Sequence, residues 1–103
     1  MKKPVSKIGV VGLGIIGGSL VKAIKRRGLC ETVVACDQDL DTLEMALKEG
    51  TIHEAGSGID CAFRDCEIVF VCVPVKMIPE TVKQLGDIVN ENCILTDVGS
   101  TKA

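Results

Sequence analysis

Four short apolar runs recur along the chain, and none of them alternates polar with apolar residues. They are Ile8–Val11, Thr32–Cys36, Ile68–Val73 and Cys93–Thr96. Uninterrupted apolar runs of this length are typical of strands buried on both faces, as in a parallel sheet covered by helices. A further short strand is expected at Thr51–His53, directly after the helix stop signal Gly50.

Amphipathic segments lie between these runs and predict helices. In the first, Ile16, Leu20 and Ile24, with Ala23 beside it, fall on one face. The cations at 25–27 suit the negative end of the helix dipole, and Gly28 stands where a C-cap is expected.

Three more helical segments follow. One covers Leu40–Glu49 with Asp39 or Asp41 as its N-cap, a short one lies near Ile59–Arg64, and the last has Pro79 in its first turn. The last presents an apolar face made of Val82, Leu85 and Val89. Strands and helices alternate, which predicts an α/β fold: a doubly wound parallel sheet with strand order 3-2-1-4-5.

Composition and charge narrow the class of protein. A chain of 103 residues forms one domain. Its aromatic content of 2% and net charge of −2 argue against nucleic acid as a partner. The apolar stretch from Ile8 to Val21 is interrupted by glycines and is too short to span a bilayer, so no membrane partner is expected.

The six cysteines favour a reducing compartment. Cys36, Cys72 and Cys93 lie in or beside apolar runs, where a thiol behaves as a small hydrophobe. There is no CxxC pair, and Cys61 and Cys66 have no partner pair at zinc-site spacing. We therefore expect buried reduced thiols, no metal site and a cytoplasmic protein.

The chemistry-bearing motif follows the first predicted strand. Its residues are Gly12-Leu13-Gly14-Ile15-Ile16-Gly17, with GxGxxG spacing. Because a strand precedes it and a helix opens within it, the motif predicts dinucleotide binding on a Rossmann-type fold. Gly12 permits the tight turn, Gly14 lets a pyrophosphate approach the backbone, and Gly17 lets helix and strand pack closely. The helix N-terminus offers N–H donors to the phosphates.

Asp37, at the end of the second strand, predicts which dinucleotide is bound. A carboxylate there accepts hydrogen bonds from the ribose hydroxyls and repels a 2′-phosphate, and neither Gln38 nor Asp39 supplies a cation. NAD is therefore expected rather than NADP. One alternative is that the glycines only make a turn and that Asp37 caps the next helix. A methyltransferase, which also places an acid after its second strand but has a different glycine loop, is a further alternative.

Two further stretches follow strands at the edge where ligands gather: Val73-Pro74-Val75 and the segment from Asp97 to Lys102. Each is as compatible with an ordinary turn or a helix cap as with a ligand contact.

Together these residues resemble the prephenate and arogenate dehydrogenases of tyrosine biosynthesis. The matching blocks are Ile8–Leu20, Asp37, Val71–Val75 and Leu95–Lys102. The first block is shared with many dehydrogenases. The features that distinguish this family best from them are the ending Gly17-Gly18-Ser19 of that block and the tail Thr-Asp-Val-Gly-Ser-Thr-Lys. The resemblance covers most of the chain.

The resemblance implies NAD-linked oxidative decarboxylation of prephenate to 4-hydroxyphenylpyruvate, or of arogenate, in a parent protein that forms a homodimer. It places Ser100 near the substrate hydroxyl and the catalytic histidine, which makes Ser100 the candidate catalytic residue. It places Val73 and Pro74 on the nicotinamide-ribose side, next to the cofactor contacts of the glycine motif.

The sequence also departs from that family. The family's catalytic histidine, in a His-Pro segment, its substrate-binding arginine and its helical dimerisation domain have no match here. The single histidine, His53, is expected to be an ordinary surface or strand-end residue. Residues 1–103 are therefore interpreted as an incomplete dinucleotide-binding domain, inactive alone, that stops before a sixth strand and leaves the strand at Cys93–Thr96 as an open edge.

Two other functions stay open on the sequence alone. The chain could be the cofactor domain of another NAD(P)-dependent dehydrogenase, acting on a hydroxy acid or an imine. It could also be a free-standing NAD-binding module without catalysis.

Overall fold

The computed structural model describes residues 5–56 and 58–97. Its helices and strands, in chain order, are β1 (Val5–Val11), α1 (Ile15–Arg27), β2 (Cys30–Cys36), α2 (Leu40–Glu49), β3 (Glu54–Ala55), β4 (Ile68–Val71), α3 (Ile78–Gly86) and β5 (Ile94–Asp97). Single 3-10 turns lie at Cys61–Phe63 and Val75–Met77. The first of these turns stands where a short helix is expected, near 59–64.

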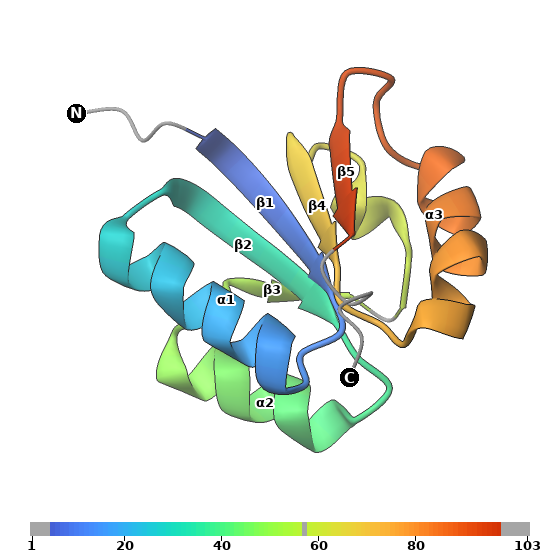
Figure 1. Ribbon diagram of the computed structural model, residues 1–103. Coiled ribbons are helices and arrows are strands. Elements are labelled where there is room, and N and C mark those ends of the chain that lie inside the picture. The colour runs from blue at the N-terminus through green and yellow to red at the C-terminus, as the bar shows by residue number, and fades with distance from the viewer. Residues whose placement is uncertain (1–4, 57, 98–103) are drawn as a thin grey trace.

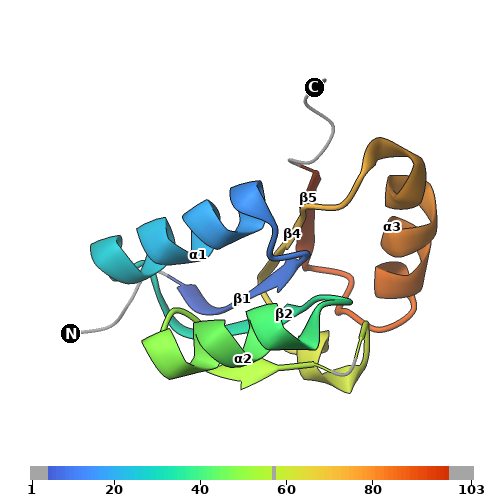
Figure 2. The same cartoon turned by 90° about the horizontal axis from the view of Figure 1, so that it is seen from below.

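The five strands form one sheet in the order β3-β2-β1-β4-β5, and every neighbouring pair is parallel. Helices α1 and α2 lie together on one side of this sheet, and α3 lies on the other (Figures 1 and 2). The predicted doubly wound order is therefore confirmed. Strands β1 and β4 are neighbours in the sheet, but the helices that follow them, α1 and α3, lie on opposite sides of it.

Both faces of the central strands are buried, as their unbroken apolar runs predict. In β2, Val33 and Ala35 join the cluster under α1 and α2, whereas Val34 and Cys36 join the cluster under α3. All four are almost inaccessible to solvent. Burial on both faces removes the polar half of the usual alternation, because neither face meets water.

The expected buried face of α1 is confirmed in part, because Ile24 is buried and Leu20 packs partly buried against the core, but Ile16 is wrong. Ile16 is 47% exposed, whereas Gly17, Val21 and Ile24 are buried. Gly17 lies so close to the preceding loop that position 17 faces the sheet, and positions 21 and 24 follow it at helical spacing. The end of the helix is as predicted: Gly28 adopts the left-handed conformation and donates its N–H to the carbonyls of Ile24 and Lys25.

The third strand lies at Glu54–Ala55 rather than at the expected Thr51–His53. The N–H and hydroxyl of Thr51 both donate to the carbonyl of Ala46, so Thr51 closes the C-terminus of α2. Pairing with β2 begins only at His53, whose N–H donates to the Val33 carbonyl. The capping bonds thus use residues that the apolar pattern assigns to the strand.

Strand β5 is an edge strand, as expected, and in the described part of the chain no strand pairs with its outer side. Open edges invite pairing with another chain. We expect the chain to self-associate with rising concentration and Ile94→Lys to reduce this, because Ile94 is 58% exposed. Sedimentation velocity measures the effect. Met45→Lys is the matched control, since Met45, on α2, is also 58% exposed; equal effects of the two variants would contradict pairing at β5.

Residues 5–56 and 58–97 contain neither a membrane span nor a metal cluster. Within them, no helix has the length and apolar character needed to cross a bilayer. Nor do three or more His, Cys, Asp or Glu side chains come together there as a metal site would require.

Candidate functional site

The candidate site lies at the carboxyl ends of β1, β2 and β4. The loop at 12–14 leaves β1 toward α1, and the loop at 72–74 leaves β4 toward α3 on the opposite face of the sheet. Loops that diverge in this way open a crevice at the edge of a parallel sheet, where ligands bind in α/β folds. Asp37 directly follows β2 at the same edge.

Two glycines of the motif are required by the packing of the protein itself. Gly12 has φ +97°, and a Cβ there would lie 2.5 Å from the Cys72 carbonyl oxygen at the end of β4. A Cβ on Gly17 would lie 1.9 Å from the Gly12 carbonyl oxygen. A side chain at either position would separate α1 or β4 from the loop. Both predicted roles, tight turn and close packing, are supported by these contacts.

Gly14 is different, because no atom beyond Gly14 itself and its two chain neighbours lies within 4 Å of the position its Cβ would take. Its φ of −64° is open to any residue. Gly14 is the N-cap of α1 and supplies no side-chain hydrogen bond, and the first turn has no acidic residue. The first N–H groups of a helix have no partner within the helix. Open space at Gly14, beside the start of the helix, fits a phosphate group bound by these N–H groups.

Asp37 binds the glycine loop with its carboxylate. The Leu13 N–H donates to Oδ2 at 2.6 Å, and the Asp39 N–H donates to Oδ1 at 2.8 Å. The Gly12 N–H donates to the Cys36 carbonyl at 2.8 Å, which ties the same loop to β2. The N-cap of α2 is Asp39, which accepts from the N–H groups at 41 and 42, so the alternative that Asp37 caps this helix is wrong.

The other predicted site residues are distributed as follows. Val73 lies against the loop, its Cγ1 being 3.5 Å from where a Gly12 Cβ would stand, and Pro74 is exposed beside it. Leu13 is buried. Ser100 lies outside the described residues and stays a prediction. His53 directly precedes β3, and its Nδ1 accepts the N–H of Val33 at 2.9 Å, as expected of a strand-end histidine.

Two cysteines flank the loop, and both are packing groups. Burial, with a contribution from Asp37, raises the pKa of Cys36 to about 12. Burial, with a contribution from Asp97, raises the pKa of Cys72 to about 11. Both thiols are therefore neutral near pH 7, whereas the nucleophilic form of cysteine is the thiolate. Among the described residues, the thiols of Cys36, Cys66, Cys72 and Cys93 take part in no disulfide.

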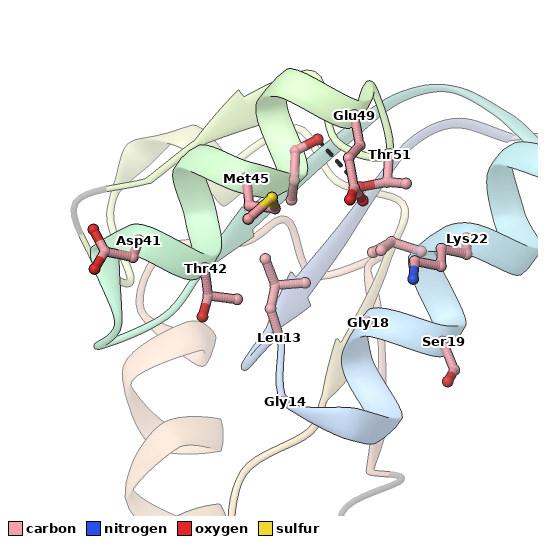
Figure 3. Close-up of a pocket in the computed structure, with 12 residues that line it drawn as sticks. Leu13, Gly14, Gly18, Ser19, Lys22, Asp41, Thr42, Met45, Glu49 and Thr51 are labelled. Carbon is pink, nitrogen blue, oxygen red and sulfur yellow. Dashed lines mark hydrogen bonds between the residues drawn. The ribbon is translucent and has the colours of Figure 1, made fainter.

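A trough of about 580 Å³ between α1 and α2 adjoins the loop (Figure 3). It shares Leu13 and Gly14 with the motif, but Asp37 and the loop after β4 do not line it. Lys22 of α1 and Glu49 of α2 lie on its two sides. The trough belongs to the helical layer, so it is distinct from the candidate site at the carboxyl ends of β1, β2 and β4.

Sequence reasoning missed the backbone groups of the site. The Leu13 N–H binds Asp37, and the Cys72 carbonyl limits what can stand at Gly12. Nearly every residue type carries the same backbone N–H and C=O groups, so no residue type signals such a contact.

Comparison with known sequences shows the relatives of this chain. Residues 20–103 match the family model of the prephenate dehydrogenase nucleotide-binding domain. The prephenate dehydrogenase of Bacillus subtilis is 29% identical over 90% of this chain and 25% of its own length. The cyclohexadienyl dehydrogenase of Zymomonas mobilis is 27% identical over 92% of this chain and 32% of its own length. The chain thus spans a quarter to a third of these curated relatives.

Comparison with solved structures finds dehydrogenases of the same kind. The arogenate dehydrogenase of Synechocystis superposes with a TM-score of 0.83 at 35% identity, over 94% of this chain and 34% of that one. The prephenate dehydrogenase of A. aeolicus, in complex with hydroxyphenyl propionate and NAD⁺, superposes with a TM-score of 0.85 at 29% identity, over 95% of this chain and 35% of that one.

Proposed function

Because this chain belongs to the prephenate dehydrogenase nucleotide-binding domain family, we propose that it binds NAD as the cofactor domain of a prephenate or arogenate dehydrogenase. The observation that carries the proposal is the open N-terminus of α1 at Gly14 beside the Asp37 carboxylate. When bound, NAD accepts a hydride from the substrate ring.

Each part of the edge has its own role in cofactor binding. The first N–H groups of α1 bind the pyrophosphate, and Asp37 accepts hydrogen bonds from the adenosine ribose hydroxyls. The negative charge of Asp37 disfavours the 2′-phosphate of NADP. Val73 and Pro74 line the nicotinamide-ribose side of the crevice.

The reaction proposed for the parent protein is oxidative decarboxylation, in which hydride transfer to NAD accompanies loss of CO₂ and an aromatic ring forms. Ser100 is the residue of this chain proposed to lie near the substrate hydroxyl. The portions of the relatives without a counterpart here are proposed to supply the substrate-binding and proton-accepting residues. The chain alone is therefore expected to bind NAD without turning substrate over.

Titration of NADH tests the proposal. The chain has no Trp, so the rise of nicotinamide fluorescence on binding is measured without tryptophan emission. Saturable binding is expected below millimolar NADH, with weaker binding of NADPH. Asp37→Ala should weaken NADH binding by at least about tenfold, which is the effect of losing one hydrogen bond to a charged group, and should narrow the preference for NADH over NADPH. Absence of saturable NADH binding up to millimolar cofactor would refute the proposed function.

A further inference from the structure

We propose that Asp37 also positions the glycine loop before any cofactor arrives, by holding the N–H of Leu13. The effect on cofactor affinity rests on the proposed function. The effect on the loop of the free protein does not.

The contacts of the carboxylate support this positioning role. Oδ2 accepts the Leu13 N–H at 2.6 Å, a short distance for a bond from a neutral donor to a charged acceptor. Oδ1 accepts the Asp39 N–H at 2.8 Å. One carboxylate therefore links the loop after β1 to the start of the β2–α2 connection.

The other contacts described for the loop hold Gly12 and the side chain of Leu13, and not the Leu13 N–H. The Gly12 N–H reaches the Cys36 carbonyl of β2, and the Leu13 side chain is buried under α1 and α2. Gly14 has open space around it and begins α1. The bond from Leu13 to Asp37 thus fixes the backbone donor directly before the N-cap Gly14, and with it the direction of the N–H groups that would face a phosphate.

Loop positioning and ribose binding are compatible at one carboxylate. Each carboxylate oxygen has two lone pairs, so Oδ1 and Oδ2 can each accept a ribose hydroxyl while keeping their N–H donors. Asp37 would then raise the affinity for the cofactor in two ways, by direct contact and by presenting a loop already in its binding conformation. If only a fraction of the molecules hold the loop in that conformation, the apparent affinity falls in proportion to that fraction.

This double role has a consequence for specificity. Removing the charge of Asp37 relieves repulsion of a 2′-phosphate but also releases the loop, so affinity for the shared pyrophosphate falls with either cofactor. Asparagine is no conservative replacement, because both carboxylate oxygens face N–H donors and an amide has only one oxygen.

The first test uses the free chain and NMR. The amide proton of Leu13 is expected at low field in the wild type, and Asp37→Ala should move it upfield and speed its exchange with solvent. Asp41→Ala is the control, because it removes an equal charge in the exposed first turn of α2. A Leu13 amide that is unchanged in a folded Asp37→Ala chain would overturn the proposal.

The second test separates loop positioning from ribose contact with two ligands, ADP and 2′,3′-dideoxy-ADP. The second ligand lacks both hydroxyls that Asp37 would bind. If Asp37 also positions the loop, Asp37→Ala weakens dideoxy-ADP binding by about tenfold, and Asp37→Asn weakens it as well. If Asp37→Ala lowers the affinity for ADP but leaves the affinity for dideoxy-ADP unchanged, Asp37 acts only through ribose contact. That result would overturn the proposal. If the wild type binds neither ligand nor NADH, the proposed function fails, and the Leu13 amide alone decides the role in the loop.

Discussion

Gly17→Ala is expected to lower the free energy of unfolding by about 3 kcal/mol, whereas Gly14→Ala should cost less than about 1 kcal/mol. The two glycines belong to one motif but meet different surroundings. A Cβ on Gly17 would stand 1.9 Å from the Gly12 carbonyl oxygen, which is backbone and cannot rotate away. A Cβ on Gly14 would meet nothing within 4 Å beyond its chain neighbours, and its φ of −64° is one that alanine adopts.

Urea denaturation followed by circular dichroism measures both changes. Gly14→Ala should fold and yet bind NADH at least tenfold more weakly, because the added methyl occupies the space proposed for the pyrophosphate. The pair therefore separates a glycine needed by the fold from a glycine needed by the ligand. Equal loss of stability in the two variants would contradict the packing described at Gly17.

The second large effect is expected at Phe63. Its side chain is fully buried in the cluster under α3, and Phe63→Ala should lower the free energy of unfolding by about 3–5 kcal/mol. Phe70, the only other phenylalanine, is half-buried and packs at the border of the other cluster, so Phe70→Ala should cost clearly less. Similar costs at the two positions would argue against Phe63 as a core residue.

The reason for the size of this effect is the fit between Phe63 and Gly9 of β1. A Cβ on Gly9 would lie 2.7 and 2.9 Å from two ring atoms of Phe63 and 3.0 Å from the Cys66 sulfur. Alanine normally stabilises a strand interior relative to glycine, but Gly9→Ala should cost about 1–3 kcal/mol here. In a Phe63→Leu background most of that cost should disappear. Additive effects in this double-mutant cycle would show that the two residues do not share one space.

The general plan of the sheet follows from local pattern. The runs at Ile8–Val11 and Ile68–Val73 lack polar positions, which predicts burial on both faces and hence a parallel sheet covered by helices. The spacing of Gly12, Gly14 and Gly17, followed by Asp37, predicts which loop faces the ligand. These features could be predicted because strand, turn and helix each depend mainly on residues close together in the chain.

The errors lie where a contact between distant elements takes precedence over a local pattern. Ile16 shares a helical face with Leu20 and Ile24, but the close approach of Gly17 to the loop leaves Ile16 itself exposed to solvent. Thr51 follows a helix stop signal as a strand would, but its N–H and hydroxyl cap α2 first.

The order of the elements, the place of the glycine loop and the acid that accompanies it can be predicted from the chain alone, because apolar periodicity and motif spacing are properties of neighbouring residues. The folded protein was needed to show that Gly12 and Gly17 serve the fold while Gly14 faces open space, and that Asp37 holds the Leu13 N–H. Those distinctions depend on distances between backbone atoms of separate elements. Backbone atoms are the same in nearly every residue, so their contacts exist only once the chain has packed.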